Sequence, residues 1–308
     1  MLRYGVKVKE GAGAQNQTLF LIDWDHPEKN EFGLAEEVTI KGALKKRPDL
    51  VLYINGIALG VIELKRASVG VGEGIRQNLD NQKKEFIQDF FTTMQLVMAG
   101  NDSQGLRYGT IETPEKYYLE WKEEVQNRFE SPLDFHLSLV CSKQRFLEIL
   151  HNFVIFDAGV KKVCRHNQFF GIQAAKGHAE KGQGGIIWHT QGSGKSLTMV
   201  WLAKWIRENI TDARVLIITD RTELDEQIES VFQGVDENIY RTKNGGDLLS
   251  KLNASEPWLI CSLVQKFGLG RDGEKVNWDD LKAHLPKNFI PKGRLFVFVD
   301  ECRVGPMI

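Results

Sequence analysis

The sequence has few cysteines and no long apolar run, and each absence excludes a class of protein. Four cysteines occur among 308 residues, and their wide spacing fits neither a zinc site nor a disulfide scaffold. No stretch of 18 apolar residues predicts a membrane helix. Residues 1–9 lack the continuous apolar core of a signal peptide. We therefore expect a reduced, cytoplasmic protein that does not associate with membranes.

The chain also has almost no net charge. Its 40 Lys and Arg residues and 41 Asp and Glu residues give a formal charge of −1, which neither favours nor excludes nucleic acid as a partner, because local patches matter more than totals. The apolar content of 42% is sufficient for buried cores. A chain of this length predicts about two domains, and no internal repeat is present.

What the sequence does contain is a glycine-rich segment at residues 185–196, with the sequence GIIWHTQGSGKS. We expect residues 186–188 to form a buried strand and a helix to begin at Lys195, so that backbone N–H groups surround a phosphate. Lys195 would reach the outer phosphates, and the Ser196 hydroxyl would bind Mg²⁺. The cradle itself would consist of Gln191, Gly192, Ser193 and Gly194. His189 stands where the usual pattern has its first glycine, and the alternative is a glycine-rich turn with a surface lysine.

Strands and helices alternate after this loop. Apolar runs at 214–220, 258–262 and 295–299 are separated by helical segments, which predicts a doubly wound, largely parallel sheet with its ligand beyond the strand carboxyl ends. Asp300 and Glu301 end the last run. Asp300 would hold Mg²⁺ through water and Glu301 would orient the attacking water, unless both are polar caps. Gln168 could read an adenine edge, although such a residue is more often on the surface.

The second informative segment is residues 47–66, RPDLVLYINGIALGVIELKR. Its two apolar runs flank Asn55 and Gly56, a strong hairpin signal. A two-residue turn would place Asp49 opposite Ile62, whereas a three-residue loop at 55–57 would pair Asp49 with Glu63. We predict the odd-length loop. Lys65 would then share the face of Glu63, because the two are separated by one residue.

Asp49, Glu63 and Lys65 together would suit phosphodiester cleavage. Two carboxylates are ligands that Mg²⁺ prefers, and the metal and lysine could activate water and stabilise charge on a scissile phosphate. A basic cluster precedes them and could hold a DNA backbone; it consists of Lys41, Lys45, Lys46 and Arg47. The alternatives are an edge hairpin with a charged, solvated end, or a module that only docks DNA or a partner.

Helices are expected in two further segments of this domain. Residues 73–90 predict one amphipathic helix, with Gln77 on its polar face either as a solvated side chain or as a ligand for DNA or metal-bound water. Residues 132–156 predict a helix or a pair of helices.

Taken in order, these motifs resemble the N-terminal part of the R (HsdR) subunit of type I restriction enzymes, over essentially the whole chain. The resemblance rests on RPD at 47–49, VIELK at 61–65, IRQ at 75–77, RHNQ at 165–168, WHTQGSGKS at 188–196, ITDRTELD at 218–225, VQKF at 264–267 and DEC at 300–302. It implies an α/β protein with two domains. Residues 1–157 would be a PD-(D/E)xK endonuclease domain with a mixed sheet. Residues 158–308 would be the first RecA-like lobe of a superfamily 2 DNA translocase.

The resemblance also implies an activity. Such enzymes use ATP and Mg²⁺ to translocate double-stranded DNA and to cut it at non-specific sites remote from the recognition site, with methyltransferase (M) and specificity (S) subunits as partners. The implied nuclease residues are Asp49, Glu63, Lys65 and Gln77. The implied nucleotide-site residues are Gln168, Lys195, Ser196, Asp300 and Glu301. Residues 265–267 would lie in a DNA-tracking or coupling motif.

Three features depart from the family pattern. Asn81 stands where the nuclease helix motif often has tyrosine, and Arg303 stands where histidine is usual. The second motor lobe, with its arginine finger, lies outside these residues, so we expect this chain alone to hydrolyse ATP poorly. We also expect the nuclease domain to begin upstream of residue 1. The alternative function is a superfamily 2 DNA helicase or remodeller whose N-terminal domain is non-catalytic.

Overall fold

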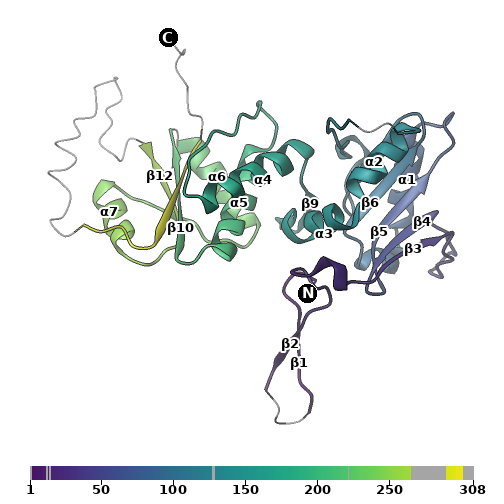
Figure 1. Cartoon of the computed structure of the whole chain (residues 1–308), viewed down its shortest axis with the longest axis horizontal. Coiled ribbons are helices and arrows are strands. Elements are labelled where there is room, and N and C mark those ends of the chain that lie inside the picture. The colour runs from purple at the N-terminus through teal and green to yellow at the C-terminus, as the bar shows by residue number, and fades with distance from the viewer. Residues whose placement is uncertain are drawn as a thin grey trace. The chain divides into compact units, whose positions relative to one another are not determined.

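The chain folds into two units (Figure 1). The computed structural model describes residues 2–11, 13, 15–126, 129–220, 222–264 and 289–300. Unit 1 comprises Met1–Ile155 and Lys161–His166, and unit 2 comprises Phe156–Val160 and Asn167–Ile308. No helix in these described ranges is long and apolar enough to cross a membrane.

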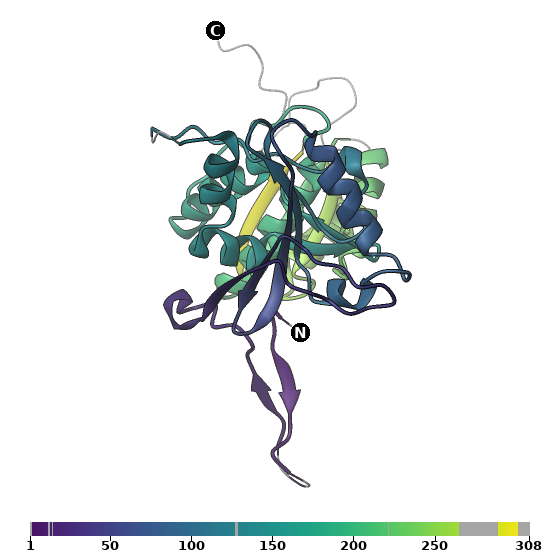
Figure 2. The same ribbon diagram turned by 90° about the vertical axis from the view of Figure 1, so that its right-hand side faces the viewer.

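Unit 1 is built on a five-stranded mixed sheet with the order β3-β4-β5-β6-β7. Its strands are β3 (Phe32–Glu36), β4 (Leu50–Ile54), β5 (Ile57–Leu64), β6 (Leu96–Asn101) and β7 (Gly105–Gly109). Only β5 and β6 are parallel; the other neighbours are antiparallel. Before this sheet, β1 (Val6–Val8) and β2 (Gln17–Leu19) form a separate exposed hairpin, the purple arm in Figures 1 and 2.

Helices cover both faces of this sheet. On one face, α1 (Val71–Asn81) packs against Ala99, and the 3-10 helix η2 (Gln88–Thr92) places Phe91 in a core with Val61. On the other, α2 (Pro132–Val140) and α3 (Lys143–Asn152) lie close to Gly100 and Gly60. Figure 2 shows the blue α1 and the teal α2 and α3 on opposite sides of the sheet. The short 3-10 helices η1 (Pro27–Lys29) and η3 (Glu115–Tyr117) complete the unit.

The helix prediction for residues 73–90 is only half right, whereas the helix pair within 132–156 is confirmed as α2 and α3. The first helix ends at Asn81, whose carbonyl accepts from the N–H of Ile87 at 3.2 Å. This reversal carries Ile87 and Phe91 into the sheet core, where both are almost fully buried. Burial of two large apolar side chains therefore outweighs continuation of the helical pattern.

Unit 2 contains a parallel four-stranded sheet with the order β11-β12-β10-β13. Its strands are β10 (Ala213–Thr219), β11 (Tyr240–Arg241), β12 (Leu259–Leu263) and β13 (Arg294–Val299). Its helices are α4 (His166–Glu180), α5 (Lys195–Asn209), α6 (Thr222–Gly234) and α7 (Gly245–Asn253). Where the chain changes unit, β8 (Val154–Asp157) and β9 (Val160–Val163) form a two-stranded sheet. The predicted α/β class, a mixed sheet followed by a largely parallel one, is confirmed.

A buried arginine fixes the base of this parallel sheet. Arg214 of β10 is 3% exposed, and its guanidinium donates to the carbonyls of Lys251, Leu252, Pro257 and Lys292 at 2.8–3.3 Å. Burial lowers the pKa of Arg214 from its ordinary value. Because one side chain satisfies carbonyls in the last turn of α7 and in the segments before β12 and β13, it sets the spacing of these segments.

The predicted buried strand at residues 186–188 is wrong. These residues form no strand, and Ile186 and Trp188 are 73% and 81% exposed. The segment lies against α4 instead of the sheet. A Cβ atom on Gly171 of α4 would be 3.3 Å from both Ile187 and His189, and the His189 ring is 3.2 Å from the carbonyl of Asn167. Contacts with α4 thus replace the expected strand pairing.

Candidate nuclease and nucleotide sites

The β4–β5 hairpin sets the geometry of the first candidate site. Its turn is the two-residue pair Asn55 and Gly56, both with positive φ (50° and 76°). Two successive positive φ angles are the signature of a type I′ hairpin turn, in which glycine carries no steric penalty. The predicted three-residue loop is therefore wrong.

A bulge within β5 nevertheless produces the predicted pairing of the carboxylates. Tyr53 pairs with Ala58 but Leu52 pairs with Gly60, so Leu59 is an extra residue in β5. Beyond the bulge, Leu50 lies opposite Ile62, which puts Asp49 opposite Glu63. The extra residue changes the register by one and so moves Glu63 to the face of Asp49. The predicted partner of Asp49 is thus correct, but the extra residue lies in β5 and not in the turn.

Glu63 points from this face into the protein, toward α1. It is fully buried, with 0% exposure, and each carboxyl oxygen has an amide donor. Gln77 Nε2 is 2.7 Å from Glu63 Oε2, and Asn81 Nδ2 is 3.4 Å from Glu63 Oε1. Gln77 and Asn81 are four residues apart and therefore share one face of α1. Asn78 fixes this helix by donating to the carbonyl of Met98 at 2.8 Å.

Lys65 and Asp49 complete the cluster. The Lys65 ammonium donates to Gln77 Oε1 at 2.6 Å, so Gln77 bridges the lysine and Glu63. Asp49 Oδ2 accepts from the backbone N–H of Leu64 at 2.7 Å, which ties the start of β4 to the end of β5. Both side chains are partly exposed, whereas Glu63 is not. The structure thus brings together Asp49, Glu63, Lys65 and Gln77.

The surroundings of Glu63 disfavour its charged form. Burial is the main cause that raises its pKa from 4.5 to about 8, and the charge of Asp49 and a hydrogen bond with Asp49 raise it further. The charges of Lys65 and Lys46 act in the opposite direction but do not compensate. At neutral pH, Glu63 therefore holds a proton that a bound cation would have to displace.

These residues fit Mg²⁺. Asp49 and Glu63 present carboxylate oxygens at one edge of the sheet, and Mg²⁺ is commonly held by one or two carboxylates together with substrate phosphates and water. In the described part of the chain no three His, Cys, Asp or Glu side chains come together. A metal here would therefore depend on the substrate for further oxygen ligands. The buried, protonated Glu63 supports the same conclusion, because a structural role gives no reason to bury a carboxyl beside another.

Replacing Glu63 by glutamine is expected to stabilise unit 1 without metal, increasingly so as the pH rises. In the folded wild type the pKa of Glu63 is raised, so its protonated carboxyl contributes stability that is fully present below pH 4.5. This contribution to the free energy of unfolding is lost progressively up to about pH 8. The full loss is on the order of a few kcal/mol. Thermal unfolding in a chelator at pH 5 and pH 8 should give a larger difference at pH 8, and the exposed Glu85→Gln should give none. A pH-independent difference would contradict this prediction.

The second candidate site lies at the N-terminus of α5. The helix begins at Lys195, and the residue before it, Gly194, has φ 87°. Gly194 provides no side-chain cap, so the first N–H groups of α5 have no capping partner from it. Gly192 also has positive φ (75°). Ser193 is buried, and its hydroxyl has no hydrogen-bond partner among the described residues. Lys195 and Ser196 are half-buried, and Gln191 is exposed. This helix N-terminus fits the phosphates of a nucleotide.

The structure places Gln168 against this loop. Gln168 is 3% exposed and donates through Nε2 to the carbonyl of Gly194 at 2.9 Å, so its side chain holds the loop in place. Asp300 follows β13, and its N–H donates to the carbonyl of Ile218 at 3.0 Å. It therefore lies at the carboxyl edge of the sheet, as predicted. Glu301 and residues 265–267 lie outside the described residues.

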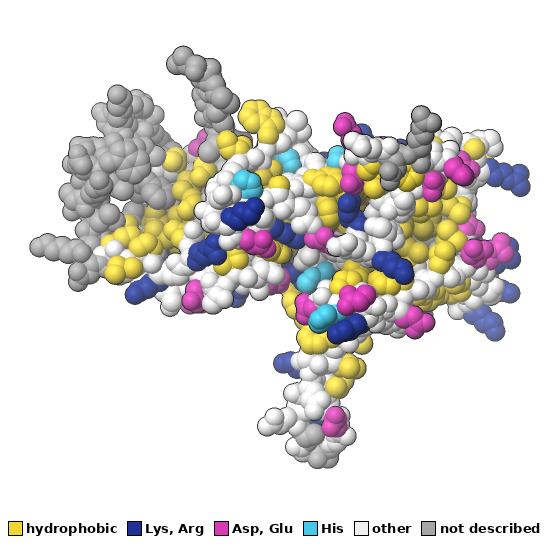
Figure 3. Space-filling model, viewed as in Figure 1, with side chains coloured by type: hydrophobic (Ala, Val, Ile, Leu, Met, Phe, Trp, Pro, Cys, Tyr) yellow, Lys and Arg dark blue, Asp and Glu magenta, His cyan; other side chains and the backbone are white. Residues whose placement is uncertain are grey.

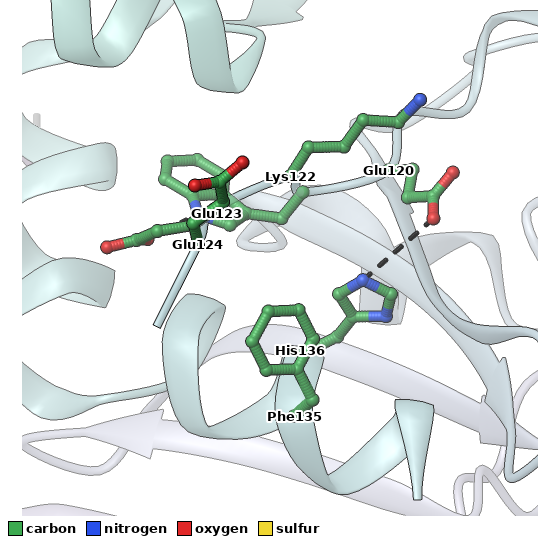
Figure 4. A pocket seen from close by; sticks show the side chains of 7 residues that line it. Glu120, Lys122, Glu123, Glu124, Phe135 and His136 are labelled. Carbon is green, nitrogen blue, oxygen red and sulfur yellow. Dashed lines mark hydrogen bonds and ion pairs between the residues drawn. The ribbon is translucent and has the colours of Figure 1, made fainter. Parts of the chain in front are cut away.

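A separate pocket of about 420 Å³ lies in unit 1 (Figure 4). It is lined by Glu120, Trp121, Lys122, Glu123, Glu124, Phe135 and His136. His136 Nε2 is 4.0 Å from Glu120, its Nδ1 accepts from the N–H of Leu106 at 3.1 Å, and burial lowers its pKa. The ring is therefore neutral at pH 7. Because α2 covers the face of the sheet opposite Glu63, this pocket is not part of the carboxylate cluster.

Two residues of the first site were not assigned a role from the sequence. Asn81 donates to Glu63 although it departs from the expected tyrosine, and its i, i+4 spacing from Gln77 is the signal that could have revealed this. Lys46 was recognised only as part of a basic cluster, whereas its charge reaches Glu63. That contact follows from tertiary structure, and no local pattern indicates it.

Both units match known families. Residues 1–116 match the family described as type I restriction enzyme R protein N terminus, and residues 167–304 match SWI2/SNF2 ATPase. These two matches fall on the sheets that carry the two candidate sites.

Similar proteins align with most of this chain. It is 27% identical over 306 residues to a putative type I restriction enzyme MjaIXP endonuclease subunit from Methanocaldococcus jannaschii, covering 87% of the chain and 29% of the relative. Identity is 26% to an endonuclease subunit from Staphylococcus aureus (89% and 29% covered) and 25% to the HindI endonuclease subunit from Haemophilus influenzae (88% and 28%). The chain thus spans less than a third of each relative. Both family matches, in this order, and the similarity over most of the chain make it similar to type I restriction enzyme endonuclease subunits.

Proposed function

We propose that this chain carries the nuclease centre and part of the motor of a type I restriction enzyme. In this proposal ATP-driven translocation of double-stranded DNA is coupled to Mg²⁺-dependent cleavage of both strands at non-specific positions remote from the recognition site. Residues 1–157 form the nuclease domain and residues 158–308 the first motor lobe. Methyltransferase and specificity subunits are the partners, and the setting is the cytoplasm.

The observation that carries the proposal is the convergence of Asp49, Glu63 and Lys65 on one face, bridged by Gln77. Mg²⁺ at the carboxylates would supply Lewis-acid stabilisation of the charge on the scissile phosphate. Gln77 and Asn81 fix the carboxyl plane of Glu63, and Gln77 also aims the Lys65 ammonium. A positioned ammonium stabilises negative charge that develops on the phosphate.

The motor role is supported by the second site. Lys195 and Ser196 open α5 at a helix N-terminus without a side-chain cap, where they would hold the phosphates and Mg²⁺ of ATP. Asp300 directly follows β13 in the parallel sheet of unit 2, and Glu301 follows it in sequence as the residue that would orient water. Gln168 supports the loop through Gly194. We expect this chain without a second lobe to hydrolyse ATP poorly.

The alternative is a superfamily 2 helicase or remodeller with a non-catalytic N-terminal domain. It would leave the buried carboxyl of Glu63, held beside Asp49 by two amides, without a chemical role. No feature of unit 1 specifically favours it.

The proposal is tested by mapping the cut positions produced by the complete multisubunit enzyme on a long DNA with its recognition site at one end. We expect double-strand breaks at scattered, distant positions, and only with Mg²⁺ and hydrolysable ATP, because translocation must precede cleavage. A non-hydrolysable ATP analogue should give no breaks. Cleavage at one fixed position, or translocation without any breaks, would contradict the proposal.

A further inference from the structure

A small loop joins β3 to Asp49 and carries Lys46. Ile40 and Lys46 form an antiparallel bridge through two backbone hydrogen bonds of 2.9 and 3.1 Å. From Lys46 the chain reaches Asp49 through Arg47 and Pro48 alone, so the loop begins the strand that carries this carboxylate. Lys46 is thus held by backbone pairing close in sequence to the candidate nuclease site.

The loop is also attached to the segment that follows α1. The N–H of Ala43 donates to the carbonyl of Phe86 at 3.0 Å. A Cβ atom on Gly42 would collide with the same carbonyl, so only glycine allows this approach. The Lys46 ammonium lies 4.1 Å from the centroid of the Phe86 ring. A cation over an aromatic face is held by the ring quadrupole, which limits where this ammonium can move.

Lys46 forms no ion pair in the described ranges of the chain, whereas its neighbour Arg47 is 3.3 Å from Glu37. Figure 3 shows Lys and Arg side chains along the margin of unit 1 at which β3 and β4 lie in Figure 1. Two cations therefore accompany the carboxylates along the chain: Lys65 directly follows β5, and Lys46 lies on the loop three residues before Asp49.

We propose that Lys46 binds a DNA backbone phosphate next to the one that is cut. This inference rests on the proposed nuclease function. Phosphate is the ligand that fits, because the ammonium is a point charge without an ion-pair partner among the described residues, on a loop held by backbone hydrogen bonds. The contact is independent of sequence and positions the strand. Lys65 acts on the scissile phosphate, and Lys46 holds the neighbouring one.

The experiment measures binding of the 308-residue chain to a short DNA duplex in Ca²⁺, over a range of salt concentrations. Lys46→Ala should weaken binding of all sequences alike and reduce the log–log salt slope by about 1, the contribution of one phosphate contact. Lys46→Arg should retain the slope, because the charge and its place on Phe86 remain. Phe86→Leu keeps the charge but removes the ring beneath it, and should weaken binding with less change of slope.

Lys143→Ala is the matched control. Lys143 also lies over a phenylalanine of unit 1, with its ammonium 5.2 Å from the Phe32 ring. Phe32 lies at the end of β3 beside the hairpin turn, where it pairs with Ile54. Asp49 lies near the other end of β3, which is four residues or about 13 Å away. Lys143→Ala should leave the affinity for DNA and the salt slope unchanged. Equal behaviour of Lys46→Ala and Lys143→Ala would overturn the inference.

Cleavage by the complete enzyme separates this inference from the proposed function. Lys46→Ala should raise KM for DNA more than it lowers kcat, because the lost contact positions the strand. If Lys46→Ala cuts like the control while Lys65→Ala is inactive, the phosphate contact is wrong and the nuclease proposal stands. If Lys65→Ala still cuts, the proposed function itself fails.

Discussion

Replacing Lys65 by alanine is expected to lower the rate of DNA cleavage by the complete enzyme by about two to three orders of magnitude, with ATP hydrolysis unchanged. The Lys65 ammonium is held at 2.6 Å by Gln77, which also donates to Glu63. Removing a preorganised cation from a site where negative charge develops affects the transition state most. The measurement is the rate of appearance of linear DNA, with phosphate release followed in the same reaction.

The control for this prediction is Lys84→Ala, which removes an exposed lysine from the segment after α1. It should retain both activities, so that loss of cleavage in Lys65→Ala cannot be attributed to net charge. Parallel loss of cleavage and ATP hydrolysis in Lys65→Ala would point to a folding defect or to a single shared site. Unchanged cleavage would exclude the nuclease role of the hairpin.

Replacing Lys195 by alanine is expected to lower DNA-stimulated ATP hydrolysis in the complete enzyme by about two to three orders of magnitude. Lys195 is the first residue of α5, where its ammonium would add to the N–H groups that receive the outer phosphates. Cleavage of distant DNA should disappear as well, because it depends on translocation. The measurements are nucleotide affinity, ATP turnover and cleavage on the same preparation.

The matched control is Lys181→Ala, an exposed lysine that follows α4 in the same unit. It should bind and hydrolyse ATP like the wild type. The two variants should thus be distinguished by ATP hydrolysis: Lys65→Ala hydrolyses ATP without cutting DNA, whereas Lys195→Ala does neither. Normal ATP turnover by Lys195→Ala would show that residues 191–196 are not the phosphate site.

The nuclease cluster could be predicted from sequence to the level of its residues but not of its backbone. The period of two along a strand and the chemistry of carboxylates were enough to pair Asp49 with Glu63. They could not locate the extra residue, because a bulge at Leu59 and a longer turn have the same effect on register. The Asn55–Gly56 dipeptide itself favoured the two-residue turn that is present.

Tertiary contacts account for the two failed element predictions. The apolar run at 186–188 has the composition of a strand, but its Ile187 and the following His189 lie against Gly171 of α4. The helical period through residue 90 continues past Asn81, yet Ile87 and Phe91 are buried against the sheet instead. The local sequence pattern identifies apolar segments but cannot show which surface an apolar side chain will pack against. Both errors therefore concern the packing partner of a segment that was correctly identified as apolar.

The central claim is that the carboxylates of Asp49 and Glu63 form a divalent-metal site, and calorimetric titration of the 308-residue chain with Mn²⁺ tests it most directly. We predict one site in the wild type at pH 8 that is lost in Glu63→Gln. At pH 6.5 binding should be weaker and should release a proton, because Glu63 has a pKa of about 8 and must lose its proton first. Equal Mn²⁺ binding by the wild type and Glu63→Gln at this site, or no proton release at pH 6.5, would contradict the account.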